Sequence, residues 1–170
     1  MQPTIYWTYF EDGPWRFLLA ATDGGLCYTG SQNRDVEELE AWAAKRFKGS
    51  ELVENAEKLA LYVEQFKQYF NGERKVLDFS IHYEGTDFQK GIWHALQDIP
   101  FGETTTYSAI AQIIGNPKAV RAVGTAIGAN PVMVVIPCHR VIGKNGTLTG
   151  FRGGLEMKEK LLELEFVNKK

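Results

Sequence analysis

The feature that most constrains the fold is a short turn between two helical patterns in the second half of the chain. Apolar residues recur at helical spacing from Tyr107 to Ile114, and a helix rich in Ala and Gly is predicted from Lys118 to about Ala129. Between them, Gly115-Asn116-Pro117 forms a tight turn, and Pro117 suits the first position of the second helix. Two helices joined by a short glycine-containing turn are typical of a helix-turn-helix.

The first half of the chain has a different pattern, in which short apolar runs alternate with two helical segments. The predicted strands are Ile5–Phe10, Trp15–Thr22, Leu26–Gly30 and Lys75–Tyr83, and the predicted helices are Val36–Phe47 and Asn55–Asn71. No βαβ repetition is present, which favours an α+β fold. We therefore expect a small N-terminal domain of antiparallel sheet and helices over residues 1–85, supporting a mostly helical domain over residues 86–170.

The second domain contains further elements on both sides of the helix-turn-helix. Thr86 or Asp87 can cap a helix that precedes it. Val132–Pro137 reads as a buried strand or extended segment, Gly143–Gly154 as a loop, and Leu155–Phe166 as a final amphipathic helix.

Charge is distributed unevenly between the two halves. Residues 1–85 contain 9 basic and 14 acidic side chains, and residues 86–170 contain 10 basic and 7 acidic ones, so that −5 and +3 give the net charge of −2. The segment Thr104–Leu155 has no Asp or Glu but includes Lys118 and Arg121. Such a surface would attract a polyanion such as DNA. Alternatively, much of the segment is core, where both signs of charge are rare.

The two cysteines, Cys27 and Cys138, are too few for a disulfide framework or a four-thiolate zinc site. A reducing compartment is therefore the simpler interpretation. The N-terminus lacks the pattern of a signal peptide, and the longest uncharged stretch, Ala122–His139, is interrupted by Gly and Pro. We expect a soluble cytoplasmic protein.

Reactive chemistry is concentrated at Pro137-Cys138-His139-Arg140. A thiolate is a strong nucleophile, and a neighbouring positive charge or histidine favours its formation. Taken alone, adjacent Cys and His residues are a weak signal, because neighbours on an extended segment point apart and a buried cysteine is commonly inert. Cys27, on a predicted strand without a basic neighbour, fits the inert type.

The wider context makes the signal specific. IPCHRVI follows RAVGTAIGANP, and FQKGIWHALQDIPFGETTTYSAIA precedes both, with GGLEMKEKLLELE after them. Together these motifs, over about Thr86–Glu165, resemble the O6-alkylguanine-DNA alkyltransferases. The resemblance implies that an alkylated guanine is flipped out of double-stranded DNA and gives its alkyl group to Cys138. The thioether is stable, so each molecule would act once.

The resemblance also implies roles for residues around the acceptor. His139 would act through a water molecule as the base, and Glu165 would hold His139. Asn130 would tie the helix-turn-helix to the active-site segment. Tyr107 would hydrogen-bond the guanine ring, and Lys158 would assist the leaving group.

DNA contacts follow from the same resemblance. The second helix of the motif would enter the minor groove, which is about 6 Å wide, so that small side chains fit. Arg121 would fill the gap left by the flipped base, unless it is simply a solvated helix residue. The expected DNA-binding residues are Lys118, Ala119, Arg121, Ala122, Gly124, Thr125 and Arg140, and the expected pocket residues are Met133, Val141, Phe151 and Arg152.

Some positions differ from the pattern of the family. Phe151 replaces a common tyrosine, so that a hydroxyl donor is lost, and Met133 replaces a proline of some relatives, which leaves the tolerated size of the alkyl group open. Activity on O4-alkylthymine is also left open. Cys27 and His82 cannot reproduce the zinc site of some relatives, so we expect no metal and no cofactor. The partner would be double-stranded DNA, bound by a monomer. The alternatives are a lesion-binding protein without transfer chemistry and a cysteine hydrolase, for which adjacent Cys and His are poorly placed.

Overall fold

The computed structural model describes residues 2–169, which form two compact units that meet in the sequence between Glu84 and Gly85. Among the helices of residues 2–169, none combines the length and hydropathy of a membrane-spanning segment. The α+β fold class predicted from the sequence is confirmed.

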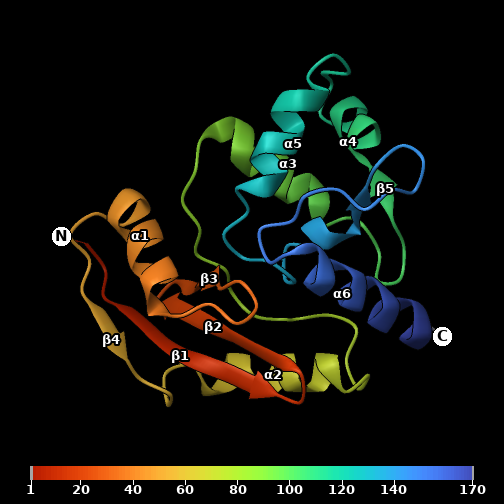
Figure 1. Cartoon of the computed structure of the whole chain (residues 1–170). Helices are drawn as coiled ribbons and strands as arrows, with labels where there is room; N and C mark the ends of the chain where they lie inside the picture. The colour runs from red at the N-terminus through yellow and green to blue at the C-terminus, as the bar shows by residue number, and fades with distance from the viewer. Residues whose placement is uncertain (1, 170) are drawn as a thin grey trace. The chain divides into compact units, whose positions relative to one another are not determined.

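The first unit is built on a four-stranded sheet, with the strand order β3-β2-β1-β4 (Figure 1). The strands are β1 (Ile5–Asp12), β2 (Trp15–Thr22), β3 (Gly25–Thr29) and β4 (Leu52–Glu54). The pairs β1–β2 and β2–β3 are antiparallel, whereas β4 runs parallel to β1. The sheet is therefore mixed, and the expectation of an antiparallel sheet holds for three of the four strands.

The side chains of β1 and β2 alternate between two cores, one on each face of the sheet. On one face, helix α1 (Val36–Arg46) packs Leu39 and other side chains against Leu18. On the other face, helix α2 (Ala60–Phe70) packs Phe66 and Phe70 against Phe10 and Phe17 of the strands. The period of two along each strand explains this division.

The predicted strand Lys75–Tyr83 is wrong. This segment is irregular and makes one isolated bridge to β3, between Ile81 and Leu26. The side chain of Gln65 takes the hydrogen bonds that a neighbouring strand would make, because it accepts from the Asp78 amide (2.7 Å) and donates to the Asp78 carbonyl (3.0 Å). The fourth strand is instead β4, whose three residues are too short to show a period.

The second unit contains the helix-turn-helix and two flanking helices. These are α3 (Asp87–Leu96), α4 (Tyr107–Ile113), α5 (Val120–Gly128) and α6 (Leu155–Asn168). Thr86 caps α3 in a reciprocal arrangement with Gln89, as the sequence suggested. The buried Trp93 indole donates to the Ala126 carbonyl (2.8 Å) and so fixes α3 against α5.

Two local predictions in the second unit need correction. Helix α5 begins at Val120 and not at Lys118, because Asn116–Ala119 forms a turn closed by the Ala119 amide and the Asn116 carbonyl (3.0 Å). Val132–Ile136 is a buried turn and not a strand, closed by the Ile136 amide and the Val132 carbonyl (3.0 Å). Within it, Val134 has a φ of 77°, which a strand does not allow.

A two-stranded parallel pair links the helix-turn-helix to the segment after Cys138. Strand β5 (Thr105–Thr106) leads directly into α4, and strand β6 (Val141–Ile142) follows the 3₁₀ turn Cys138–Arg140. Thr105 pairs with Val141, and Thr106 pairs with Ile142. Thr106 also caps α4, since its hydroxyl accepts from the Ala109 amide.

Candidate active site

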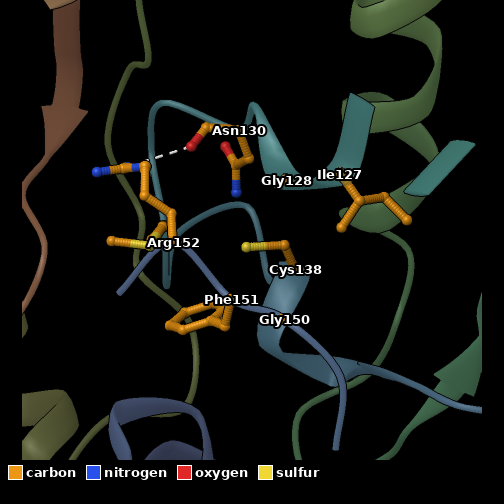
Figure 2. Close-up of a pocket in the computed structure, with 8 residues that line it drawn as sticks. Ile127, Gly128, Asn130, Cys138, Gly150, Phe151 and Arg152 are labelled. Atoms are coloured by element: carbon orange, nitrogen blue, oxygen red, sulfur yellow. Dashed lines mark hydrogen bonds between the residues drawn. The ribbon is translucent and has the colours of Figure 1, made fainter. Parts of the chain in front are cut away.

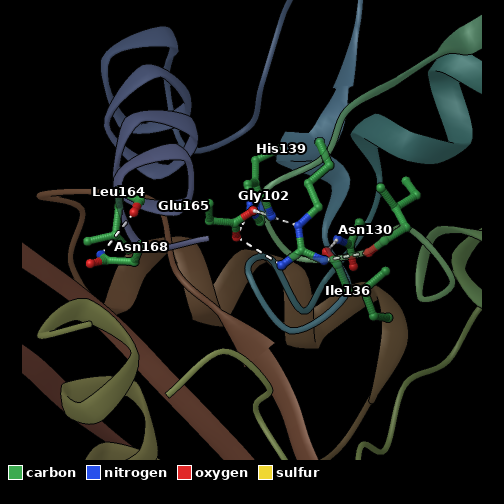
Figure 3. A network of polar contacts seen from close by, with 9 residues as sticks. Gly102, Asn130, Ile136, His139, Leu164, Glu165 and Asn168 are labelled. Atoms are coloured by element: carbon green, nitrogen blue, oxygen red, sulfur yellow. Dashed lines mark hydrogen bonds and ion pairs between the residues drawn. The ribbon is translucent and has the colours of Figure 1, made fainter. Parts of the chain in front are cut away.

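Cys138 begins a 3₁₀ turn that Asn130 holds in place. The Asn130 side chain donates to the Ile136 carbonyl (2.8 Å) and accepts from the Val132 amide (2.9 Å). The Cys138 amide in turn donates to the same Ile136 carbonyl (2.7 Å). Figure 3 shows Asn130 and Ile136 on this buried segment, which follows the end of α5. The structure therefore links helix α5 to the cysteine through Asn130.

A small pocket lies beside the Cys138 thiol. Figure 2 shows the sulfur pointing into the space between Asn130 and Phe151. The cavity volume is about 10 Å³, and Cys138 is 4% exposed. The pocket is lined by Ile127, Gly128, Asn130, Met133, Cys138, Gly150, Phe151 and Arg152.

Three of the four expected pocket residues, Met133, Phe151 and Arg152, line this pocket. The fourth, Val141, is fully buried in β6 and is not among the lining residues. Ile127, Gly128 and Gly150 complete the wall. Sequence reasoning missed them because an apolar residue or glycine at a helix end or in a loop carries no chemical signal.

His139, the residue after Cys138, forms a buried pair with Glu165 of α6. His139 Nε2 lies 2.7 Å from Glu165 Oε2, and both side chains are almost fully buried (Figure 3). An ionised carboxylate only accepts hydrogen bonds, so Nε2 carries the hydrogen and Nδ1 has a free lone pair. Among the described residues, the buried Nδ1 has no hydrogen-bond partner. The imidazole is therefore oriented as a base with an unused acceptor.

Arg140 is the second partner of Glu165. Its Nε lies 2.7 Å from Oε1 and its Nη2 lies 2.9 Å from Oε2, while Nη1 donates to the Ile99 carbonyl (2.6 Å). The residue is 7% exposed. The expectation that Arg140 contacts DNA does not fit this geometry, because the guanidinium is buried and already engaged. The family resemblance suggested a residue that contacts DNA, but the fold turns this side chain inward.

Burial and charge set the protonation of this cluster. Burial tends to raise the pKa of Glu165, but hydrogen bonds and charges from His139 and Arg140 outweigh it and hold the pKa well below its usual range. Burial lowers the pKa of His139, against the opposing effect of Glu165. At neutral pH, Glu165 is thus ionised and His139 is neutral.

The thiol itself rests in its neutral form. Burial raises the pKa of Cys138, although the Asn130 side chain and the charges of Arg152 and Lys158 act in the opposite direction. Lys158 is 1% exposed, and burial lowers its pKa while Cys138 acts to raise it. A proton must therefore leave Cys138 before or during nucleophilic attack.

Tyr107 and Lys158 meet at one loop residue, Thr149. The Tyr107 hydroxyl hydrogen-bonds the Thr149 hydroxyl (2.5 Å), and Lys158 Nζ donates to the Thr149 carbonyl (3.3 Å). Sequence reasoning named both partners but missed Thr149. A loop threonine carries no signal until its neighbours in space are known.

The outward side of α5 is open and lacks acidic side chains. Lys118, Arg121, Ala122 and Thr125 are exposed, and Ala119 and Gly124 are half-buried. These residues, except Gly124, line an open groove together with Thr86, Phe88 and Gln89 of the α3 region and Ala126. The arrangement offers positive charge beside small side chains, which fits a narrow groove of a polyanion.

Comparison with known proteins agrees over almost the whole chain. Residues 87–167 match the family described as 6-O-methylguanine DNA methyltransferase, DNA binding domain, and residues 5–83 match its ribonuclease-like domain. An inducible methylated-DNA–protein-cysteine methyltransferase of Bacillus subtilis is 54% identical, over 96% of this chain and 92% of that protein. One from Methanosarcina acetivorans is 45% identical, over 95% and 98%.

Solved structures agree in fold. The O6-methylguanine methyltransferase of Mycobacterium tuberculosis superposes with a TM-score of 0.82 at 35% identity, covering 97% of this chain and 94% of that chain. The M. tuberculosis OGT crystallised with DNA gives a TM-score of 0.80 at 37% identity, with 96% and 94% covered. The family resemblance predicted from the sequence is thereby confirmed, and the chain belongs to the 6-O-methylguanine DNA methyltransferase family.

Proposed function

We propose that this protein repairs DNA by moving the alkyl group of an O6-alkylguanine onto its own Cys138. The observation that carries the proposal is the buried His139, which follows Cys138 in the chain and is fixed by Glu165 through Nε2 with Nδ1 left as an acceptor. Family membership and relatives named methylated-DNA–protein-cysteine methyltransferases support the same reaction. The relative crystallised with DNA supports duplex DNA as the partner.

The chemistry is one displacement at the alkyl carbon. A bond forms between Cys138 Sγ and the alkyl carbon, and the bond from that carbon to guanine O6 breaks with its electron pair going to the base. The thiol proton passes through a bridging water to His139 Nδ1. The resulting imidazolium is stabilised by the Glu165 carboxylate, which stays ionised because Arg140 also holds it.

The departing base needs its own stabilisation. Lys158, buried next to the site, would stabilise the negative charge that develops on guanine, and Tyr107 would hydrogen-bond the ring. Because a thioether does not release its alkyl group under these conditions, each chain reacts once. No cofactor takes part in this scheme.

The DNA side of the proposal rests on α5. We place α5 in the minor groove, with Ala119, Ala122, Gly124 and Thr125 allowing close approach and Lys118 near a phosphate. The exposed Arg121 would enter the duplex where the target base has left. The base is flipped because its alkyl carbon cannot be reached within the stack. A single chain supplies all of these parts, so a monomer suffices.

Intact-protein and peptide mass spectrometry tests the proposal. The protein is mixed with a duplex that contains O6-methylguanine, and Cys138→Ser serves as the control. We expect one added methyl group per chain, located on Cys138, with no further gain at excess DNA. Tight binding without a mass gain would instead indicate a lesion-binding protein. A duplex with O4-methylthymine, run in parallel, tests the wider substrate range.

The flipping step has a separate test in Arg121→Ala. We expect this substitution to slow transfer from duplex DNA more than transfer from free O6-benzylguanine, since a free base needs no flipping. Equal losses on both substrates would contradict the role of Arg121.

A further inference from the structure

The cavity beside Cys138 is too small for the substrate that the proposed function requires. Its volume of about 10 Å³ corresponds to about one water molecule. Pockets that hold small organic ligands measure roughly 300–1,000 Å³. One wall must therefore move before any base can approach the Cys138 sulfur.

The two walls of the cavity differ in how they are held. On one side, Asn130 is fixed by its hydrogen bonds to Val132 and Ile136. The other side is Gly150–Arg152, part of the irregular segment that follows β6. A wall of irregular backbone moves more easily than one tied into a helix end. We therefore take the Gly150–Arg152 wall as the one that opens.

Thr149 connects this movable wall to the rest of the unit. Its hydroxyl bonds the Tyr107 hydroxyl, and its carbonyl accepts from Lys158 Nζ (3.3 Å). Tyr107 is a firm anchor, because it starts α4 and its ring packs over Gly124 of α5, where an added Cβ would lie 3.8 Å from the ring. The position of Gly150 and Phe151 thus depends on the Thr149–Tyr107 hydroxyl pair, on the Lys158 bond, and on Arg152, which donates to the Asn130 and Pro131 carbonyls (3.2 Å each).

The same Tyr107 hydroxyl is the group proposed to bind the guanine ring. Its oxygen carries one hydrogen, so while it donates that hydrogen to Thr149 it cannot also donate it to an incoming base. The Thr149 contact and donation to the base therefore compete for the same hydrogen. A base that offers a hydrogen-bonding atom at that place compensates for the lost Thr149 contact, and a base without one does not.

We infer that Thr149 is a specificity-determining latch, which closes the pocket over Cys138 until a base replaces it on Tyr107. This inference rests on the proposed function and extends it. The latch protects the thiol from small electrophiles while the protein is free. It also restricts entry to bases that can take over the Tyr107 hydrogen bond.

The test compares Thr149→Val, which removes the hydroxyl and keeps the shape, with Thr149→Ser, which keeps a hydroxyl. Thr147→Val is the matched control, because Thr147 is an exposed threonine of the same segment. The first readout is the rate at which iodoacetamide labels Cys138, followed by peptide mass spectrometry. We expect Thr149→Val to label about 3- to 10-fold faster, the size expected for one net hydrogen bond, and Thr149→Ser and Thr147→Val to match the wild type.

The second readout is alkyl transfer to Cys138 from free O6-benzylguanine and from free O6-methylguanine. We expect Thr149→Val to increase the transfer rate more with O6-benzylguanine than with O6-methylguanine, because the bulkier benzyl group needs a wider opening. Wild-type labelling and wild-type substrate preference in Thr149→Val would overturn the latch. If Thr149→Val does not fold, Tyr107→Phe breaks the same bond from the other side and should also label faster.

The two proposals fail in different ways. If the wild-type protein transfers no alkyl group from any of these substrates, the proposed function is wrong, whatever the labelling rates are. If it transfers normally but labelling does not depend on the Thr149 hydroxyl, the latch alone is wrong.

Discussion

Cys27 and Cys138 are both buried free thiols, yet their surroundings have little in common. Cys27 lies within β3 in the apolar core of the first unit, where burial raises the pKa of its thiol to about 12. Cys138 is also shielded from water, but Asn130, Arg152 and Lys158 favour its thiolate, and His139 follows it in the chain. Burial thus makes a cysteine inert unless polar groups are built around it to compensate.

The largest expected contrast comes from removing each sulfur in turn. Cys138→Ser should abolish alkyl transfer, because a serine hydroxyl releases its proton far less readily than a thiol and is a far weaker nucleophile. Cys27→Ser should transfer at the wild-type rate. Mass spectrometry after incubation with the methylated duplex checks both variants. Methyl transfer in Cys138→Ser would show that another residue accepts the group.

Removing the base next to the reactive thiol should give the second-largest effect. His139→Gln is expected to slow transfer by about 10²-fold or more, the range of general acid–base catalysis. His94→Gln is the matched control, because His94 is an exposed histidine on α3 of the same unit. Single-turnover rates measure the difference. Equal rates in the two variants would remove His139 from the reaction.

The pH dependence of the transfer rate should distinguish Cys138, which has His139 as its base, from a buried cysteine without a base. Transfer needs neutral His139, whose pKa lies below its usual value of 6.5 because of burial. The rate should therefore be constant above about pH 6.5 and fall, by about tenfold per unit, only when the pH drops below the lowered pKa. This acid limb should disappear in His139→Gln. A rate that already falls between pH 8 and 7 would contradict the assignment.

The free energy of unfolding should also depend on the protonation of His139 at acidic pH. Below pH 6.5 the unfolded chain takes up a proton at His139 that the folded protein excludes, so the free energy of unfolding should decrease there. Denaturation in urea at pH 7.5 and pH 5.5 measures the change, with His139→Gln as the reference. An equal decrease in both proteins would assign the effect to other groups.

The smallest expected effect is on the stability of the first unit. Cys27→Ser places a hydroxyl in an apolar core and should lower the free energy of unfolding by about 1–3 kcal/mol. Cys27→Ala isolates the loss of the sulfur from the cost of the hydroxyl. Urea denaturation of both variants measures the free energy lost with the sulfur and the additional cost of burying the hydroxyl. Wild-type stability in Cys27→Ser would show that the hydroxyl finds a partner.

Much of the fold could be predicted because local patterns agreed with the final structure. The first three strands, both helices of the helix-turn-helix and the cap at Thr86 were found from periodicity and capping residues. The segment Lys75–Tyr83 failed because Gln65, on another element, takes the backbone hydrogen bonds of Asp78. Val132–Ile136 failed because apolar residues fit a buried turn as well as a strand.

Contacts between residues distant in the chain also limited the prediction of the site. The sequence motif located Cys138, His139 and Glu165, but it gave no direction for the Arg140 side chain. That direction depends on α6 and on the Ile99 carbonyl, which are distant in sequence. Thr149 was missed for the same reason, since its importance comes only from Tyr107 and Lys158.

The parallel pair of β5 and β6 has a consequence for how this protein can change over evolution. Thr106 is at once a strand residue and the cap of α4, and Val141 follows the Cys138 turn without a spacer. Inserting or deleting one residue on either side would shift the register and rotate the nucleophile away from the helix-turn-helix. The distances from Thr105 to Tyr107 and from Cys138 to Ile142 are therefore fixed.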